Sequence, residues 1–201
     1  MKRALLAIEI ALIGVTAVLM GYVGYVWLSA HYTQARGHIL INRPKEHERL
    51  TPVEGSLLGE IEIPRIGLSS IILEGTEPGT LRRAVGHIPG TALPGQPGNL
   101  CIAGHRDTFF RPLRRVKAGD EVVVKTPTGT VLYRVKSAQV VRPEDAQVLD
   151  NTLVDVVTLV TCYPFHFIGT APKRFVVRAV RIEGERRDGG ADSRQKVRRP
   201  S

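Results

Sequence analysis

A long apolar run near the N-terminus restricts this chain more than any other feature of its sequence. From Ala4 to Leu28, 25 residues are apolar almost throughout, which is long enough to cross a hydrocarbon core of ~30 Å as a helix. A cleavable secretory signal usually has an apolar stretch of only ~7 to 15 residues. Tyr22, Tyr25 and Trp27 crowd the C-terminal end of the run, as is typical of rings at the headgroup level of a bilayer. The run therefore predicts a transmembrane anchor that contacts lipid through residues 4–28.

The charges that flank this run indicate its orientation. Lys2 and Arg3 precede it, which favours a cytoplasmic N-terminus. Basic residues also follow it and reduce the charge asymmetry, namely Arg36, Arg43, Lys45 and Arg49. We expect a single-pass protein of the cell membrane whose folded part lies outside the cytoplasm.

The rest of the chain predicts a polar connection, one folded domain and a basic tail. We expect a cytoplasmic tip and anchor at 1–30, a stalk at 31–54 that has no apolar periodicity and could be partly helical, a domain at 55–183 and a disordered tail at 184–201. The central segment has the length of a single domain, and 43% hydrophobic residues in the whole chain suffice for an ordinary core.

The chain carries a net charge of +9, which raises the question of a polyanionic partner. Part of this excess lies in the predicted tail, where six basic residues stand against two acidic ones between Arg186 and Arg199. The sequence has neither zinc-finger spacing nor a basic stripe interleaved with aromatic residues. We therefore expect no nucleic-acid partner.

Short runs rich in β-branched residues recur along the predicted domain and alternate with Pro- and Gly-rich turns. This pattern predicts strands separated by tight connections, and a mainly β barrel or sandwich. The expected strands are Gly59–Ile63, Ser69–Leu73, Asn99–Gly104, Glu121–Thr126, Thr130–Val141, Val156–Thr161 and Arg174–Ile182. The expected short helices are Thr80–Val85, Phe109–Val116 and Pro143–Val148.

Two cysteines, Cys101 and Cys162, are too few for a disulfide scaffold and lack metal-ligand spacing. Cys162 directly follows the apolar run Val156–Thr161, so it is expected where a strand leaves the sheet. A thiol there can act as a nucleophile if a base or a cation promotes the thiolate. A buried structural thiol is the alternative, and for Cys101 a small core residue is the simpler interpretation. No metal site and no cofactor are expected.

Three histidines are candidates for the base. His105 follows the strand-like run that begins at Asn99, so two strand ends could bring its imidazole close to the thiol of Cys162. His87 and His166 are rivals that composition alone does not exclude. The remaining histidines fall in the predicted stalk and are poor candidates, namely His31, His38 and His47.

A cationic side chain could stabilise the oxyanion of an acyl-transfer reaction. Arg174 opens the last strand-like run, and a guanidinium presents fixed donors without losing its charge. Lys173 and Arg178 are alternatives on the same segment. A solvated arginine on a strand edge would look the same in sequence.

Two segments resemble the sortase family. GHIPGTALPGQPGNLCIAGHRDTFFRPL, at Gly86–Leu113, is similar to the segment that carries the sortase histidine. TLVTCYPFHFIGTAPKRFVVRA, at Thr158–Ala179, is similar to the segment with the Thr-Leu-x-Thr-Cys signature and the downstream arginine. The resemblance implies a closed eight-stranded β-barrel with Cys162 as nucleophile, His105 as acid and base, and Arg174 as oxyanion or substrate clamp.

Within that family the run Cys-Tyr-Pro-Phe, followed by Gly-x-Ala-Pro-x-Arg, resembles class D. The sequence before the domain has no lid with an Asp-Pro-aromatic anchor, which disfavours the pilin-polymerising class C. The resemblance implies cleavage of an LPxTG-like sorting signal between Thr and Gly and transfer of the acyl group to an amine, on a peptidoglycan stem peptide or a protein lysine. Thr161 would bind the substrate backbone, or would be an ordinary sheet threonine.

Two other functions fit the same sequence features. A plain cysteine endopeptidase would pass the acyl group to water instead of an amine. A membrane-tethered β domain without catalysis would use its basic tail to bind wall polymer or anionic lipid.

Overall fold

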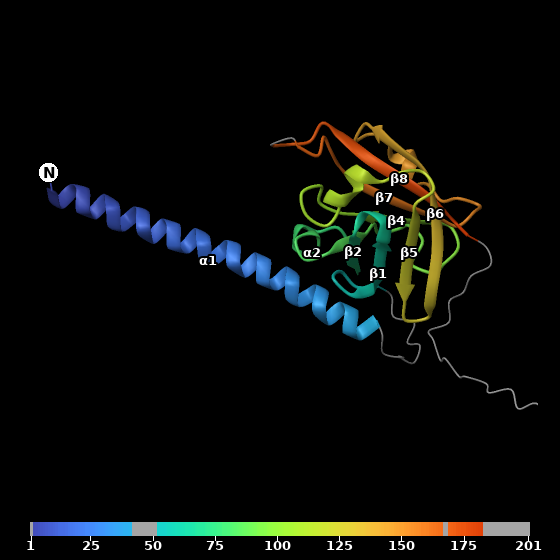
Figure 1. Cartoon of the computed structure of the whole chain (residues 1–201), viewed down its shortest axis with the longest axis horizontal. Coiled ribbons are helices and arrows are strands. Elements are labelled where there is room, and N and C mark those ends of the chain that lie inside the picture. The colour runs from blue at the N-terminus through green and yellow to red at the C-terminus, as the bar shows by residue number, and fades with distance from the viewer. Residues whose placement is uncertain (1, 42–51, 167–168, 183–201) are drawn as a thin grey trace, which may run out of the picture.

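The chain forms one long helix and one β-barrel. The computed structural model describes residues 2–41, 52–166 and 169–182. Helix α1 (Lys2–Ile41) extends away from the barrel as a single rod (Figure 1). The whole of the predicted tail at 184–201 and residues 42–51 of the predicted stalk lie outside the described residues.

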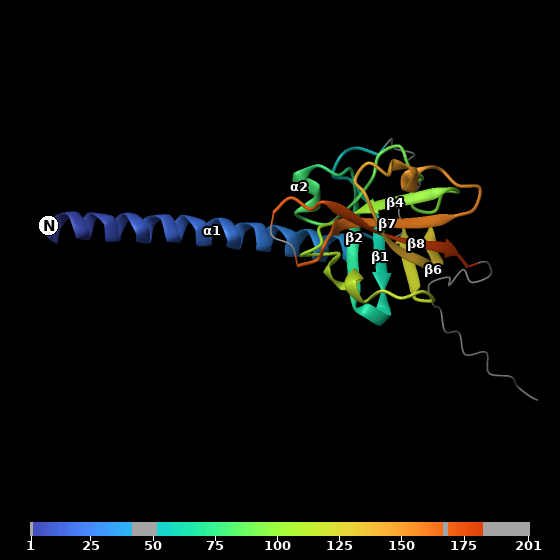
Figure 2. The ribbon, with the colours of Figure 1, turned by 90° about the horizontal axis from the view of Figure 1, so that it is seen from above.

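Eight strands close the barrel, in the order β1-β2-β3-β4-β7-β8-β6-β5. The closed eight-stranded architecture is confirmed, and closure leaves no unpaired sheet edge. The strands are β1 (Leu57–Ile63), β2 (Leu68–Glu74), β3 (Val85–His87), β4 (Asn99–Ala103), β5 (Glu121–Thr126), β6 (Gly129–Val141), β7 (Val156–Tyr163) and β8 (Lys173–Arg181). Short helices connect them: η1 (Pro64–Ile66), α2 (Pro78–Leu81), η2 (Arg111–Arg115) and η3 (Ala146–Leu149). Figure 2 shows the barrel from above.

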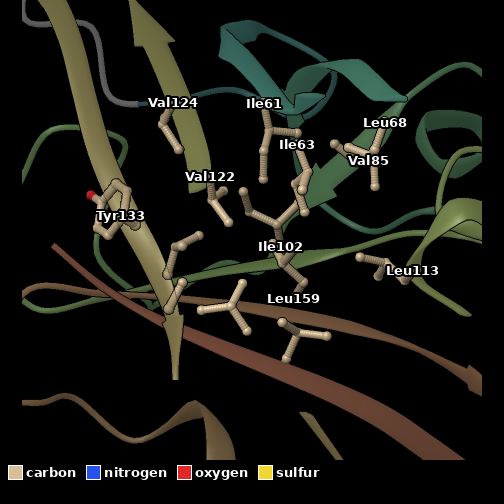
Figure 3. Packing of buried hydrophobic residues seen from close by; sticks show 14 of the residues in the cluster. Ile61, Ile63, Leu68, Val85, Ile102, Leu113, Val122, Val124, Tyr133 and Leu159 are labelled. Atoms are coloured by element: carbon tan, nitrogen blue, oxygen red, sulfur yellow. The ribbon is translucent and has the colours of Figure 1, made fainter. Parts of the chain in front are cut away.

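Side chains along each strand point alternately into and out of the barrel, and the inward-pointing ones fill its interior. Leu100 and Ile102 of β4, Leu159 of β7 and Val177 of β8 belong to one buried cluster, which also contains the ring of Phe110. Figure 3 shows side chains of this cluster converging from strands on different sides of the barrel. Burial of this apolar surface is the main contribution to the stability of the fold.

One strand, β3, was not predicted from the sequence. The run Thr80–Val85 was expected to form a short helix, but α2 ends at Leu81 and Val85 begins strand β3. All three residues of β3 are buried, so the alternation that identifies a half-buried strand is absent. Its parallel pairing with β2 and antiparallel pairing with β4 come from tertiary structure.

The end of α1 packs against the barrel within the segment expected to be a stalk. The Gln34 side chain accepts a hydrogen bond from the Ile71 N–H at 2.9 Å and donates to the Arg83 carbonyl at 3.0 Å. Gly37 is buried there, and a Cβ on it would lie 2.4 Å from the Ile71 side chain. Residues 31–41 therefore continue the helix, and residues 34–37 are held against β2.

Candidate active site

Three strands bring the predicted reactive residues to one end of the barrel. Cys162 on β7 is directly opposite Arg174 on β8 in the antiparallel register. Strand β4 runs parallel to β7 with Ala103 opposite Val160, and the Gly104 N–H continues this pairing by donating to the Val160 carbonyl at 3.1 Å. Two residues further along, the same register places His105 beside Cys162.

The three side chains also share a face of the sheet. Leu159 on β7 and Val177 on β8 point into the barrel core, so the residues at odd spacing from them, Cys162 and Arg174, point outward. His105 is three residues after the inward Ile102 and follows the same rule. Strand alternation and register together predict that thiol, imidazole and guanidinium meet on the outer surface.

A cleft of about 300 Å³ occupies this position. His105 is exposed and Cys162 is half-buried, so the thiol is accessible from the cleft. The lining residues are His105, Arg106, Asp107, Cys162, Gly169, Thr170, Ala171 and Arg174. Sequence reasoning missed Arg106, Asp107 and the wall at 169–171, although the first two directly follow His105 in sequence.

Arg174 is partly engaged by its own loop. One terminal nitrogen, Nη1, donates to the carbonyls of Ala171 at 3.2 Å and Lys173 at 3.0 Å. In the part of the chain that the structure describes, Nε and Nη2 have no partner, so they remain available to a ligand in the cleft. Arg178 lies four residues further along β8, about 13 Å away, and Lys173 does not line the cleft.

The rival histidines have other surroundings. His87 is 2% exposed; its Nδ1 lies 2.7 Å from the Glu74 carboxylate, and its Nε2 lies 3.1 Å from the Ala92 carbonyl. Both ring nitrogens are thus occupied inside the protein. His166 is exposed but does not line the cleft. His31 lies on α1, the His38 side chain lies outside what is described, and His47 falls in the masked stretch between 41 and 52.

Thr161 points into the barrel. It is 3% exposed, and its hydroxyl donates to the Gly104 carbonyl at 2.7 Å. This bond ties β7 to the backbone immediately before His105. Through this hydrogen bond Thr161 can position His105 relative to Cys162 without contacting a ligand in the cleft.

The loop after β4 is held by close packing at Gly104. A Cβ on this residue would lie 2.7 Å from the Phe110 ring, so the ring requires glycine at this position. The Phe110 N–H also donates to the His105 carbonyl at 3.0 Å. The turn from His105 to Phe110 is therefore fixed at both ends, with Phe110 buried in the core.

Cys101 is separate from the cleft. It is fully buried, and burial raises the pKa of its thiol to about 11. It is opposite Thr158 on β7, four residues from Cys162, which corresponds to about 13 Å and exceeds the span of a disulfide. Both cysteines are free thiols.

Arg106 connects the two loops that form the cleft. Its guanidinium donates to the Pro164 carbonyl at 3.1 Å and to the Gly169 carbonyl at 3.0 Å. Both carbonyls belong to the connection between β7 and β8, whose residues 169–171 line the cleft. Because Arg106 directly follows His105, one side chain fixes the cleft wall relative to the predicted base.

We expect Arg106→Gln to lower kcat for the predicted acyl transfer by about tenfold to a hundredfold, because small displacements of reacting groups are costly. Arg106→Lys should recover little, since an ammonium on a flexible stem lacks the rigid fork that reaches two carbonyls. KM and the thermal midpoint should change much less than kcat. Arg111→Gln, at an exposed position on η2, is the matched control; equal turnover of Arg106→Gln and this control would refute the positioning role.

No group of three or more His, Cys, Asp or Glu side chains within the described ranges is arranged to hold a metal ion. The functional groups that line the cleft are instead a thiol, an imidazole, two guanidinium groups, a carboxylate and the hydroxyl of Thr170. This set suits nucleophilic acyl transfer, with a proton carrier and an oxyanion donor beside the nucleophile.

Comparisons with known proteins agree with this chemistry. A Sortase D of Bacillus subtilis (strain 168) is 31% identical over 142 residues, covering 70% of this chain and 72% of the relative. The solved structure of a Clostridium perfringens Sortase D5 transpeptidase has a TM-score of 0.67 at 29% identity and covers 77% of this chain and 98% of its own. Sortase C1 of Streptococcus agalactiae has a TM-score of 0.59 at 31% identity, covering 64% and 69%.

The sortase domain model matches residues 61–182, a range that contains the whole cleft. The similarity to two D-type sortases agrees with the class D resemblance of the Cys162 segment. By its barrel and this domain match, the chain belongs to the sortase family of cysteine transpeptidases.

Proposed function

We propose that this sortase cleaves an LPxTG-like sorting signal between Thr and Gly and joins the new carboxyl end to an amine. The observation that carries the proposal is the convergence of Cys162, His105 and Arg174 on one cleft. Sortases act on sorting signals and amine nucleophiles; the LPxTG-like motif and an amine from a peptidoglycan stem peptide or a protein lysine are the specific proposals for this chain.

The proposed first half-reaction forms a thioester. In the proposed step the thiol proton of Cys162 lies on His105, the Cys162 thiolate attacks the carbonyl carbon of the threonine residue, and Arg174 donates hydrogen bonds from Nε or Nη2 to the oxyanion. The C–N bond then breaks while protonated His105 gives its proton to the departing glycine amine. The acyl group is left on Cys162 as a thioester.

The second half-reaction reverses these roles. An incoming amine attacks the thioester carbon, His105 takes the proton from the amine, and the Cys162 thiolate leaves. The thioester retains the reactivity of the bond that was cut, so the new amide forms without a separate energy source. Microscopic reversibility explains why one imidazole serves as acid and as base.

The proposed location is the cell membrane, with α1 as the anchor. Sortases are membrane-associated, and α1 contains a candidate membrane span within Ile8–Gly37 that by length and composition could cross a bilayer. Lys2 and Arg3 support a cytoplasmic N-terminus, which would place the barrel on the outer side, where sorting signals and wall amines occur.

The fate of the acyl group tests the proposed reaction. The full chain in detergent is incubated with a peptide library of sorting-signal type, and intact mass spectrometry reads the adduct on Cys162. Adding a diamino peptide or a lysine-containing protein should convert this adduct into an amide product at the expense of the hydrolysed acid. If hydrolysis alone occurs at every amine concentration, the protein is an endopeptidase and the transfer step of the proposal fails.

A further inference from the structure

A second hollow lies between α1 and the barrel, outside the catalytic cleft. It has a volume of about 520 Å³. The helix side consists of Tyr22, Val23, Val26, Trp27, Ala30, His31 and Gln34, and the barrel side consists of Arg82, Thr108 and Phe109. The helix side of this groove is thus made largely by the last turns of the predicted membrane span.

The contact between helix and barrel sets the height of the domain above a bilayer. Gln34 is bonded to the backbone of Ile71 and Arg83, and it lies six residues, about 9 Å of helix, beyond Leu28 at the end of the apolar run. The headgroup layer of a bilayer is roughly 5 to 8 Å thick on each side. Barrel residues beside the helix on the membrane side of Gln34 therefore reach the headgroup layer.

The groove extends from this contact toward the membrane. Tyr22 and Trp27 on its helix side are 59% and 69% exposed, so the barrel does not cover them. In a membrane-inserted helix these rings would be covered by lipid. In both overall views α2, which ends just before Arg82, lies on the side of the barrel that faces the N-terminal part of α1 (Figures 1 and 2).

The barrel side of the groove offers one charge and one apolar surface. Arg82 is exposed, and within the described ranges its side chain has no hydrogen-bond or ion-pair partner. Phe109 is half-buried, with part of its ring against the core. An unpaired guanidinium at the rim of an apolar groove complements a molecule with an anionic head and an apolar tail.

We propose that this groove holds a phospholipid of the bilayer into which α1 inserts, with its phosphate at Arg82 and an acyl chain along Val23 and Val26. The contact seats the barrel on the membrane surface. Because Thr108 lines the groove and His105 lines the cleft, the same short turn links lipid to the catalytic end, over at most about 11 Å of chain. The enzyme would thus work on peptides presented at the membrane surface.

Spin labelling of the full chain tests the seating. A nitroxide is attached to Thr108→Cys in a Cys162→Ser background; Cys101 stays in place because it is fully buried with a raised pKa. The protein is placed in vesicles of phosphatidylcholine and phosphatidylglycerol in equal amounts. We expect the label to collide more with oxygen, which concentrates in lipid, than with a water-soluble nickel chelate.

Leu153→Cys is the matched control for the label. Leu153 is fully exposed and precedes the N-terminal end of β7, whereas the cleft lies at the opposite end of the same strand, about 20 Å away. Its label should collide mainly with the nickel chelate. Trp27, the single tryptophan of the chain, reports insertion of α1 independently through quenching by brominated lipid.

These measurements separate the outcomes. If Trp27 is quenched while the label at Thr108→Cys is as water-exposed as the label at Leu153→Cys, the barrel stands clear of the membrane and the lipid proposal is overturned. Absence of Trp27 quenching overturns it as well, by removing the membrane from the groove. Neither result bears on acyl transfer, because the labelled proteins lack the nucleophile and their turnover is not measured.

A charge substitution tests the headgroup contact. Arg82→Gln should shift the population of the label at Thr108→Cys toward the water-exposed state by about fivefold, the effect of one arginine near an anionic surface. Arg134→Gln, an exposed arginine on β6 near the strand end remote from the cleft, should change nothing. Equal shifts for the two variants would exclude a specific role of Arg82.

Discussion

A Cys162→Ala variant is expected to lose measurable cleavage and acyl transfer, with a fall in kcat of about 10⁴-fold or more. The reason is chemical: the proposed thioester intermediate cannot form without the thiol. The other functional side chains of the cleft, among them His105, Asp107 and Thr170, do not supply a nucleophile equivalent to the thiol. Peptide cleavage followed by chromatography, and intact mass spectrometry of the protein with substrate, measure the two losses.

Cys101→Ala is the matched control, because it removes the other thiol without touching the cleft. It should retain most of the turnover and lose a little stability. In the unmodified protein at neutral pH, iodoacetamide should label Cys162 and spare Cys101, since burial excludes the reagent and raises the pKa of the Cys101 thiol to about 11. Turnover by Cys162→Ala, or its loss in Cys101→Ala alone, would contradict the covalent mechanism.

The second large effect is expected from a pair of histidine substitutions that should fail in different ways. His105→Ala should lose about 10² to 10⁴-fold in kcat and keep its unfolding free energy, because the side chain is exposed. His87→Ala should lose roughly 3 to 5 kcal/mol of unfolding free energy, because it leaves the buried Glu74 carboxylate without its partner. Urea unfolding and steady-state kinetics on both variants separate stability from chemistry.

Replacing both members of the buried pair provides the control. A double variant with His87→Leu and Glu74→Leu should be more stable than His87→Ala, because it also removes the buried Glu74 carboxylate, the most costly group to leave unpaired. Under conditions where it is folded, it should retain turnover. A folded but inactive double variant, together with an active His105→Ala, would transfer the role of base to His87.

Much of the barrel could be predicted from sequence because its strands alternate and its turns are rich in Pro and Gly. Seven of the strands fall at or within two residues of their expected bounds. Strand β3 could not be found in this way, because its three residues are all buried and show no alternation. The polar segment 31–41 was expected in a stalk that could be partly helical; that α1 continues through it and is held against the barrel by Gln34 comes from the tertiary structure.

Some of the candidate active-site residues could likewise be predicted from the sequence, and others could not. Residue type and position marked Cys162 as a thiol at a strand end, but left His105, His87 and His166 open until the family resemblance was considered. The structure separates them by surroundings: His87 has both ring nitrogens occupied by the protein, and His105 lines the cleft with Cys162. Adjacency to His105 was the one signal for Arg106 in sequence, because the carbonyls of Pro164 and Gly169 that it binds lie on a distant loop.

Cys162, with which the predicted mechanism begins, illustrates what the sequence determines and what depends on tertiary structure. By itself the sequence determined the apolar run at 4–28, the strand periodicity and the chemical types of the reactive groups, because these depend on neighbours along the chain. Only the tertiary structure decided that β4 lies beside β7 and that Arg174 is opposite Cys162. Strand order and register are set when the barrel closes, and they bring residues that are distant in sequence together in one cleft.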